Sequence, residues 1–343
     1  MKKVSVVILN WNGADMLRRF LPSVISCSEE DGVEVCVADN ASTDDSCRIV
    51  SDEFPSVRLI RLSENYGFAE GYNRALEAVD AEYSLLLNSD VEVTQGWLLP
   101  LLDYMDNHPQ VGACQPKLLS ERQRTMFEYA GACGGYLDRF GYPFCRGRIM
   151  GSVEADMGQY DNITPIFWAT GAALLVRTSL FRKVGGLDAR FFAHMEEVDL
   201  CWRLRSRGWK IVCIPQSVVY HVGGATLNKE NPRKTYLNFR NNLLMLHKNL
   251  QRDEYSRVMY IRCFLDYVAA FQYLLKGDVS NFKAVCKARK DFRSMKSDYA
   301  DVRTRNLALA TNKDIPERTT WSILWRYYVL GKRRFSDLDI PHL

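Results

Sequence analysis

The sequence lacks the motifs by which several large enzyme classes bind their cofactors. Neither G-x-G-x-x-G nor G-x-x-x-x-G-K-[ST] occurs in the 343 residues, which argues against a dinucleotide-dependent redox enzyme and against a P-loop ATPase. The ten cysteines contain no C-x-x-C pair, and several lie in apolar, strand-like runs, so we expect neither a disulfide framework nor a zinc module. Such cysteines are typical of a reducing cytosol, where they pack as small hydrophobic residues.

Net charge and long apolar runs are scarce as well. The net charge of +4 and the pI of about 8.4 are too small to predict a nucleic-acid partner. No segment approaches the roughly 18 uninterrupted apolar residues of a membrane span, and no charged and then apolar leader precedes the first expected strand at Val4. These absences predict a cytoplasmic protein whose contact with a membrane, if any, is peripheral and on the inner face.

The sequence does contain a regular alternation of strand and helix patterns in its first 90 residues. Apolar runs predict strands at residues 4–9, 33–38, 57–62 and 83–90, and helical spacing predicts helices at about 16–24, 47–54 and 68–79. This alternation predicts an α/β fold with right-handed crossovers and a mostly parallel sheet. The turns that follow the strands would then gather along one rim of the sheet.

Each of these strands runs into a polar turn. The four turns are Asn10-Trp11-Asn12, Asp39-Asn40, Asn65-Tyr66-Gly67 and Asn88-Ser89-Asp90. Ligands of open α/β sheets bind outside the carboxyl ends of the strands, so Asp90 lies where a metal or phosphate would bind, and Asp39 where a ribose hydroxyl or base N–H would. Helix capping is the alternative for both residues: Asp90 before a helix over residues 94–105, and Asp39 near Ser46.

Further along, a carboxylate-rich helix start stands out. Residues 107–165 predict loops and short strands over the cleft, residues 172–177 a strand, residues 180–184 a short helix, and residues 211–214 and 218–220 strand pieces that lead to His221. A helix expected from Glu196 carries Glu196, Glu197 and Asp199 in its first turn, where negative charge is favourable anyway, so these three alone do not indicate a site. With Asp90 and His221 they form a ligand set that suits Mg²⁺ or Mn²⁺ better than a structural zinc.

The last third predicts helices at residues 228–250 and 254–275, followed by a lysine- and arginine-rich stretch and an aromatic, cationic segment at residues 321–334. We therefore expect two parts, a catalytic domain at residues 1–250 and a basic helical appendage at residues 251–343. Two interpretations of the appendage stay open. It is either a membrane-surface element, or an ordinary packed helix or homodimer contact.

Several sequence motifs together resemble family 2 glycosyltransferases with the GT-A fold, near the bacterial rhamnosyltransferase-like branch. They are V-S-V-V-I-L-N-W-N from Val4, D-N-A-S-T-D from Asp39, N-Y-G-F-A-E-G-Y-N from Asn65, L-N-S-D ending at Asp90, W-A-T-G-A-A from Trp168, H-M-E-E-V-D-L from His194, H-V-G-G from His221 and R-N-N from Arg240. The resemblance covers roughly residues 1–250 in the family's order, and it is the set rather than any one motif that is specific.

The resemblance implies a role for each matching residue on the donor side. Asp39 would bind the nucleobase or ribose, with Asn10 and Trp11 beside the base, and Asn65, Gly67 and Asn73 would line the nucleotide pocket together with Asn88 and Ser89. Asp90 matches the last carboxylate of the family's D-x-D motif and would hold the metal with His221. Asn88 replaces the first carboxylate of that motif, which leaves fewer negative oxygens for the metal.

On the acceptor side, Glu197 occupies the position of the family's general base. Glu in place of Asp lengthens the reach, so the choice between Glu196 and Glu197 stays open, with Asp199 in the same turn. Trp168, Gly171 and Arg240 would border the acceptor side of the cleft.

The resemblance predicts an inverting enzyme that uses Mn²⁺ or Mg²⁺. It would move a sugar from a nucleotide-sugar donor to a hydroxyl of a cell-surface glycan or lipid-linked acceptor. Resemblance to the rhamnosyltransferase-like branch suggests dTDP-rhamnose as the donor. Two alternatives stay open. A nucleotidyltransferase acting on a sugar phosphate would be expected to carry a Gly- and Arg/Lys-rich loop where this chain has Asn10-Trp11-Asn12-Gly13. A catalytically inactive nucleotide-sugar-binding module would bind the donor without turning it over.

Overall fold

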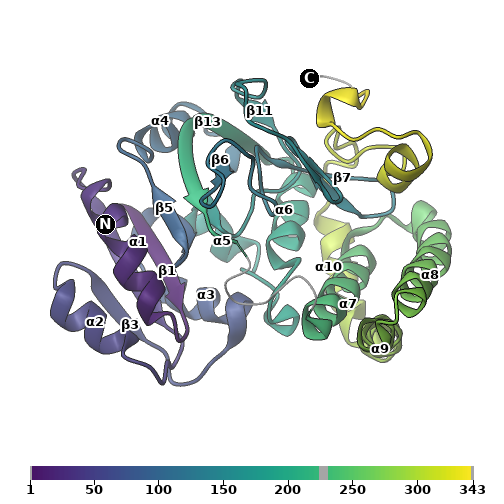
Figure 1. Ribbon diagram of the computed structural model, residues 1–343, viewed down its shortest axis with the longest axis horizontal. Helices are drawn as coiled ribbons and strands as arrows, with labels where there is room; N and C mark the ends of the chain where they lie inside the picture. The colour runs from purple at the N-terminus through teal and green to yellow at the C-terminus, as the bar shows by residue number, and fades with distance from the viewer. Residues whose placement is uncertain (1, 224–230, 341–343) are drawn as a thin grey trace.

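The computed structural model describes residues 2–223 and 231–340, built around a large mixed sheet with helices on both faces (Figure 1). Strands β1 (Lys2–Asn10), β2 (Val33–Asp39), β3 (Arg58–Arg61) and β4 (Ala81–Asn88) run parallel in the order β3-β2-β1-β4. Helices α1 (Ala14–Ser26), α2 (Ser46–Glu53) and α3 (Gly67–Glu77) connect them. The predicted alternation of strand and helix is confirmed. Gly224 and the expected helix start at Asn228 lie outside the described residues.

The second half of the main sheet mixes strand directions. β12 (Ala173–Arg177) pairs antiparallel with both β4 and β6 (Val111–Ser120), and β13 (Lys210–His221) runs parallel to β6. β11 (Thr164–Pro165) and β5 (Val91–Val93) pair antiparallel with β13. The two strand pieces expected before His221 are one strand with a register shift between Ile214 and Val218, where a bulge interrupts the pairing.

Residues 107–165 differ most from the sequence-based prediction. β6 is a ten-residue strand in the centre of the main sheet, not a loop over the cleft. A strand is hard to predict from its sequence, V-G-A-C-Q-P-K-L-L-S, because Gly, Pro and small residues break the strand pattern. The segment after it forms a small antiparallel sheet of β7 (Gly135–Leu137), β8 (Pro143–Cys145), β9 (Arg148–Ile149) and β10 (Ser152–Val153).

Alternation along the strands places apolar side chains on both faces of the sheet. In β1, Val6 and Ile8 belong to one hydrophobic cluster and Val7 to the other. Helices α1, α2 and α4 (Leu99–Asn107) cover the first face, while α3, α5 (Thr178–Lys183) and α6 (Glu196–Ser206) cover the second. This double cover explains why the strands read as near-continuous apolar runs.

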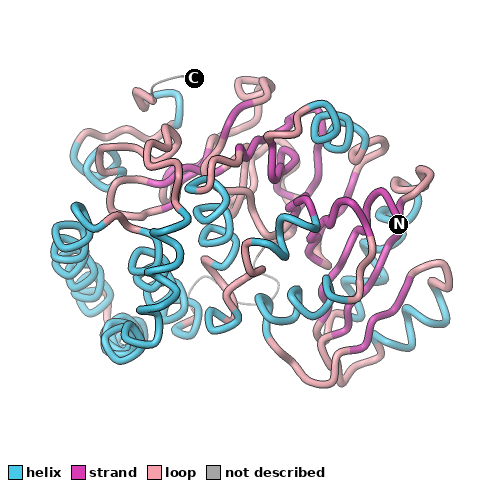
Figure 2. Tube along the Cα trace, turned by 180° about the vertical axis from the view of Figure 1, so that it is seen from behind, coloured by secondary structure: helices cyan, strands magenta, loops and turns pink. Residues whose placement is uncertain are grey.

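Helices after residue 231 form a layer at one edge of the molecule, seen from opposite sides in Figures 1 and 2. The layer comprises α7 (Pro232–Asn249), α8 (Arg252–Leu275), α9 (Val279–Met295) and α10 (Ala300–Leu309). The chain then returns to the small sheet, where Phe335 packs on Tyr136 at 5.0 Å between ring centroids. A helical C-terminal region is therefore confirmed, and its apolar residues share a core cluster with the sheet.

Among the described residues, α8 is the one helix long and apolar enough to cross a membrane by length and composition, with a mean hydropathy of 1.2 over its most apolar window. Its apolar run is interrupted by Arg262 and Asp266, in keeping with the expectation that no segment approaches 18 uninterrupted apolar residues. Length and composition alone do not separate a spanning helix from a surface helix.

Candidate functional site

Strand register brings the carboxyl ends of three parallel strands into line. Asn10 pairs with Asp39 across β1 and β2, and Leu9 pairs with Asn88 across β1 and β4. The polar turns that follow these strands therefore lie side by side, as the sequence predicts. The half-exposed Trp11 lies in the first of these turns.

Amide and carboxylate side chains tie the first two turns together. The Asn10 amide donates to Asp39 at 3.1 Å, and the backbone N–H of Ser42 donates to the other oxygen of that carboxylate at 2.9 Å. Asp39 is buried, and it does not cap α2, since the backbone N–H of Ser46 bonds to Asp44 instead. Asn10 Oδ1 is buried without a hydrogen-bond partner in the described structure.

Asn40 extends this arrangement to the third turn. Its amide donates to Asn65 Oδ1 at 3.1 Å and to Gly67 O at 3.0 Å, and its carbonyl oxygen accepts from the backbone of Tyr66. Gly67 has a φ of +74°, and a Cβ there would lie 2.5 Å from the Phe192 ring, so only glycine fits. The amide rim, as we call Asn10, Asp39, Asn40 and Asn65, is thus a connected hydrogen-bond network.

Asn73 has a different role from the one that the resemblance implies. Its amide donates to the Leu187 carbonyl at 2.9 Å, and its carbonyl oxygen accepts from the Leu187 N–H at 2.8 Å. Both ends of the side chain are therefore used to join α3 to the segment that follows α5. We assign Asn73 no contact with a nucleotide.

The turn at Asn88, Ser89 and Asp90 is not a helix cap. β5 follows it directly, and α4 begins only at Leu99. The Asn88 N–H bonds to Ala172 O at 3.0 Å, which fixes the turn against β12. Ser89 lies close to Gly13, where an added Cβ would be 3.8 Å from the Ser89 hydroxyl. The helix expected over residues 94–105 is α4, which starts later, at Leu99, after β5 has paired with β13.

His221 lies between two carboxylates. Its Nε2 is 3.1 Å from Asp90 Oδ1 and 3.4 Å from the Asn88 amide nitrogen, while its Nδ1 is 3.4 Å from Glu128 Oε1. Burial lowers the pKa of His221, but Glu128 and Asp90 outweigh it and raise that pKa to about 10. Burial likewise raises the pKa of Asp90, yet the hydrogen bond and charge of His221 hold it below its usual value. We call Asn88, Asp90, Glu128 and His221 the acid corner.

Glu128 was not singled out from the sequence. It lies in the segment between β6 and β7, where neither spacing nor a polar turn marks it, and its other oxygen accepts from the Ala130 N–H at 2.5 Å. Only the fold brings it to His221. A carboxylate that holds the far nitrogen of a histidine sets the ring's orientation and directs the near nitrogen.

The acid corner fits a divalent ion that shares its coordination with a substrate. In the part of the chain that the structure describes, no three His, Cys, Asp or Glu side chains are grouped so that they could hold a metal ion. The reason is that Asp90 and Glu128 contact opposite nitrogens of His221. Asp90 Oδ1 and His221 Nε2 face each other at 3.1 Å, so an ion bound by both would displace the Nε2 proton, and Mg²⁺ is usually held by one or two carboxylates plus substrate phosphates.

Two unpaired carboxylates open helix α6. Glu196 and Glu197 each have one buried oxygen without a hydrogen-bond partner, and we call them the acid pair. Burial raises the pKa of Glu197 to about 7, and burial and the neighbouring Glu197 charge raise that of Glu196 well above its usual value. Glu196 is buried, whereas Glu197 is partly exposed, so an incoming hydroxyl reaches Glu197 more readily.

Asp199, in the same first turn of α6, is engaged inside the protein. Its carboxylate accepts from Arg203 at 2.9 Å, Lys248 at 2.8 Å and Asn249 at 2.8 Å. Burial would raise the pKa of Asp199, but the charges of Lys248 and Arg203 hold it below its usual value. With its oxygens used to join α6 to α7, Asp199 anchors the helix and is no candidate for the base.

A strained loop leads into the acid pair. Phe192, His194 and Met195 all have φ between 65° and 73°, which non-glycine residues rarely adopt. The Asn241 amide donates to the carbonyls of Phe191, Ala193 and His194 at 2.8–2.9 Å, so α7 holds the loop in place.

Arg240 serves the same loop. It donates to the carbonyls of Arg190 and Phe191 at 2.9 and 3.1 Å, and it is not turned to the cleft as the resemblance implied. Trp168 is buried too, with its indole N–H donating to Tyr136 O and its ring against Gly135. Of the three expected acceptor-side residues, Gly171 alone lies beside the acid pair.

Gly171 and Ala172 connect the acid corner with the acid pair. Ala172 bonds to Asn88, and a Cβ on Gly171 would lie 3.9 Å from the Glu197 Cβ and 3.0 Å from the Phe68 ring. One dipeptide therefore separates the turn that carries Asp90 from the helix start that carries Glu197. The structure brings together residues that are more than a hundred positions apart in the sequence.

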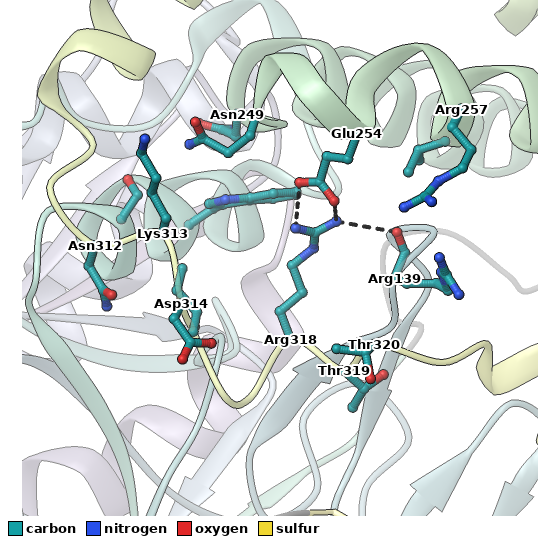
Figure 3. Close-up of a pocket in the computed structure, with 15 residues that line it drawn as sticks. Arg139, Asn249, Glu254, Arg257, Asn312, Lys313, Asp314, Arg318, Thr319 and Thr320 are labelled. Atoms are coloured by element: carbon teal, nitrogen blue, oxygen red, sulfur yellow. Dashed lines mark hydrogen bonds and ion pairs between the residues drawn. The ribbon is translucent and has the colours of Figure 1, made fainter.

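A cavity of about 210 Å³ lies elsewhere, at the far end of α6 (Figure 3). Arg318 donates to both oxygens of Glu254 there, at 2.7 and 2.8 Å, next to the Arg139 carbonyl. Trp202 and Ser206 of α6 line it. Since a helix rises about 1.5 Å per residue, Trp202 and Ser206 lie roughly 8–15 Å along α6 from the acid pair, so this cavity is separate from that pair.

Comparison with known proteins relates the chain to a sequence family. A model of the family described as Glycosyl transferase family 2 matches residues 5–130. Over 232 residues the chain is 32% identical to N-acetylglucosaminyl-diphospho-decaprenol L-rhamnosyltransferase of Mycobacterium tuberculosis, with 63% of this chain and 75% of the relative covered.

Solved structures agree with this relationship. TarS 1–349 of S. aureus in complex with UDP-GlcNAc superposes with a TM-score of 0.57 at 14% identity, covering 90% of this chain and 89% of that one. Mannosyltransferase PcManGT of Pyrobaculum calidifontis, in complex with GDP-Man and Mn²⁺, gives a TM-score of 0.52 at 14% identity over 91% and 81% of the two chains. These likenesses confirm the predicted GT-A fold. The family match and the mycobacterial relative favour sugar transfer over nucleotidyl transfer and show that the chain belongs to glycosyltransferase family 2.

Proposed function

We propose that the protein is an inverting, metal-dependent glycosyltransferase that moves a sugar from a nucleotide-sugar donor to an acceptor hydroxyl. One observation carries the proposal: the unpaired acid pair lies one dipeptide away from the acid corner, beside the ends of the parallel strands. A base and a diphosphate site that adjoin in this way suit a displacement at an anomeric carbon.

The amide rim is the proposed nucleotide site. Its hydrogen bonds fix Asp39, Asn40 and Asn65 before any ligand arrives, so little side-chain entropy is lost on binding. The half-exposed Trp11, next to Asn10 in the first turn, offers a flat apolar surface to the nucleobase. Gly67 lets the backbone of the third turn approach closely.

Glu197 is the proposed general base. The acceptor oxygen forms a bond to the anomeric carbon as the bond from that carbon to the diphosphate oxygen breaks, and the hydroxyl proton passes to the Glu197 carboxylate. The nucleoside diphosphate leaves with the electron pair, on the face opposite the attack. A pKa of about 7 suits this role, since about half of the Glu197 carboxyl groups are ionised at pH 7 and the carboxylate accepts a proton well.

Asp90 and His221 are the proposed metal ligands, with Asn88 beside them. A divalent cation bound there would neutralise the negative charge that develops on the leaving diphosphate. Asp90 supplies the one carboxylate of the turn, and the contact between Glu128 and His221 Nδ1 directs Nε2 towards Asp90.

The identity of the substrates is proposed from relatives. The mycobacterial relative is named for transfer of L-rhamnose to a diphospho-decaprenol, and a 24% identical relative is Rhamnosyltransferase WbbL of Escherichia coli. By this similarity we propose dTDP-rhamnose as donor and a lipid-linked precursor of a cell-surface glycan as acceptor. We also propose that the enzyme works at the cytoplasmic face of the membrane, with residues 1–250 as the catalytic domain and residues 251–343 as the appendage.

A thermal-shift panel of nucleotides and nucleotide sugars, with and without Mn²⁺, tests the donor and metal proposals, because a ligand that binds only the folded state raises the melting temperature in proportion to affinity. We expect the largest shift from a dTDP-sugar with Mn²⁺. NMR of the anomeric centre after transfer then tests inversion. Retention of the donor's anomeric configuration would overturn the mechanism, and equal shifts with and without Mn²⁺ would overturn the metal site.

A further inference from the structure

The outer face of α8 is apolar where a surface helix is normally polar. Four side chains at helical spacing are 56–80% exposed, namely Tyr260, Phe264, Phe271 and Leu275. Tyr267, Val268 and Leu274 extend the same face, and from Tyr260 to Leu275 the only other exposed side chain is Gln272. Scattered exposed apolar residues are ordinary, but a contiguous patch marks an interaction surface. We call these seven apolar residues the α8 face.

The two charged residues between Tyr260 and Leu275, Arg262 and Asp266, point inwards instead. Arg262 and Asp266 are almost fully buried and pair at 3.1 Å, and Arg289 of α9 also binds Asp266. Arg262 donates further to Phe140 O at 2.9 Å and to Asn242. Turning α8 to hide its apolar face would break this buried network, so the exposure is fixed by the fold.

The same network argues against α8 crossing a bilayer. A spanning α8 would carry Arg262 and Asp266 into hydrocarbon and remove Asp266 from Arg289, and charged residues at the centre of a membrane helix are unfavourable. The helix is therefore suited to lie on a membrane with its apolar face down.

Cations border the α8 face. Lys276 follows its C-terminal end, Arg252 and Arg257 are exposed near its N-terminal end, and α9 exposes Lys283, Lys287, Lys290 and Arg293 at helical spacing. Lys287 is paired with Asp291. Basic residues around an apolar helix face are the recognition pattern for anionic lipid headgroups.

A second patch of the same kind lies at the same edge of the molecule, next to α8 in Figures 1 and 2. In the segment around Trp325–Val329, four apolar side chains are 53–62% exposed, namely Trp325, Tyr328, Val329 and Leu330. The exposed Arg333 and Arg334 follow. Phe140 links the two elements: its carbonyl accepts from Arg262 on the buried side of α8, and Phe140 lines the hollow beside Trp325.

We propose that the α8 face and the patch at Trp325–Leu330 dock on the surface of an anionic lipid bilayer. The proposal rests on the proposed function and deepens it, since it names the surface that would bring the enzyme to a lipid-linked acceptor. A second copy of the chain fits less well. A twofold contact through antiparallel α8 helices would bring Lys276 of one copy to the cationic end, Arg252 and Arg257, of the other.

Flotation of the full-length protein with vesicles of phosphatidylcholine, with or without phosphatidylglycerol, tests the proposal. We expect recovery with the anionic vesicles only, lost at high salt because the charge contribution is screened. The double variant Phe264→Glu/Phe271→Glu should reduce the bound fraction at least tenfold. Met157→Glu, which changes an 87% exposed side chain outside both patches, should float like the wild type.

Wild-type protein that stays unbound with anionic vesicles would overturn the proposal, and so would a double variant that floats like the wild type. A wild-type dimer that the double variant converts to monomer, without vesicle binding, would assign the α8 face to self-association instead. Thermal shift with donor and Mn²⁺ on the same proteins separates this test from the proposed function. Wild-type protein that fails to float but binds the donor would overturn the docking proposal and leave the proposed function standing. Wild-type protein that floats but does not bind the donor would overturn the proposed function and leave membrane docking standing.

Discussion

The two halves of the candidate site are built from opposite kinds of interaction. In the amide rim, most polar groups have a neutral partner at ordinary hydrogen-bond distance, so the turns are fixed before a ligand binds. In the acid corner and the acid pair, carboxylates are buried next to each other or to a single imidazole, and two oxygens have no partner. The first half is suited to positioning, and the second to reactions that need unsatisfied charge.

The same contrast recurs within one turn of α6. Glu197 has a raised pKa because its carboxylate is largely shielded from water and has no cation beside it, whereas the charges of Lys248 and Arg203 lower that of Asp199. Position in the sequence does not separate these residues, since both lie in the first turn of the helix. What separates them is which neighbours the fold supplies.

We expect the largest effect from replacing Asp90, the one carboxylate in the turn Asn88-Ser89-Asp90. Asp90→Asn should lower transfer by about a thousandfold or more, because metal stabilisation is worth several kcal/mol and each 1.36 kcal/mol is tenfold. Mn²⁺ binding, followed by titration calorimetry with the donor nucleotide present, should weaken in parallel. Asp45→Asn, at an exposed rim carboxylate, is the matched control and should behave like the wild type. Normal turnover by Asp90→Asn would mean that this turn is not a metal site.

We expect the second largest effect from Glu197→Gln, which should reduce kcat by about 10²–10⁴-fold and leave donor binding largely unchanged. The comparison variant is Glu196→Gln, whose buried carboxylate should matter less. Single-turnover kinetics with saturating donor measure both. If Glu196→Gln showed the large loss and Glu197→Gln kept its rate, the base would be Glu196.

The pH dependence should reveal the same carboxylate. A base with a pKa of about 7 predicts that activity falls roughly tenfold per pH unit below that value. The same raised pKa has the opposite effect on the free energy of unfolding. Between about pH 4.5 and about pH 7 the folded protein keeps a proton on Glu197 that the unfolded chain releases, so the free energy of unfolding should fall as the pH rises through this range. Urea unfolding at several pH values measures this free energy. In Glu197→Gln it should depend less on pH over the same range. An unchanged slope in the variant would place the raised pKa on another group.

Glu128→Gln should have a smaller effect. Partners that orient a metal-binding histidine typically change metal affinity by about 10–100-fold, so we expect a loss of that size in Mn²⁺ affinity. The imidazole nitrogen shifts of His221 in NMR spectra should change too, which loss of stability alone would not cause. Wild-type Mn²⁺ affinity in Glu128→Gln would show that its contact with His221 is incidental.

Asp199→Asn should leave the chemistry almost untouched and weaken the fold. Breaking a buried ion pair by removing one partner costs about 3–5 kcal/mol, since Arg203 and Lys248 would lose their shared carboxylate. Chemical denaturation measures the loss, and kcat measured well below the unfolding midpoint should stay close to that of the wild type. A large fall in kcat without loss of stability would return Asp199 to the list of candidate bases.

The sequence predicted well wherever local pattern decides structure. The parallel strands ending at Asn10, Asp39 and Asn88 are near-continuous apolar runs followed by polar turns, and both signals are local. The sequence did not predict strand β6, because its Gly and Pro residues break the strand pattern. In addition, its partners β12 and β13 come from distant segments of the chain.

Side-chain partners were the least predictable part of the site. Glu128 meets His221 only because β6 and β13 run parallel and bring their ends together. Asn73, Asp199 and Arg240 match family motifs, yet their polar atoms bond to backbone or to buried ions that no spacing rule reveals. A motif identifies a residue that matters, and the contacts decide whether it acts on a substrate or on the loop beside it.

The loop before the acid pair has a consequence for modular engineering. Asn241 holds that loop, and its neighbour Asn242 accepts from Arg262, which pairs with Asp266, which in turn binds Arg289. A relay of polar contacts thus runs from α9 through α8 and α7 to within one residue of the loop's anchor. Exchanging α8 and α9 between related enzymes while keeping α7 would therefore require that the incoming helices carry partners equivalent to Arg262, Asp266 and Arg289 for Asn242.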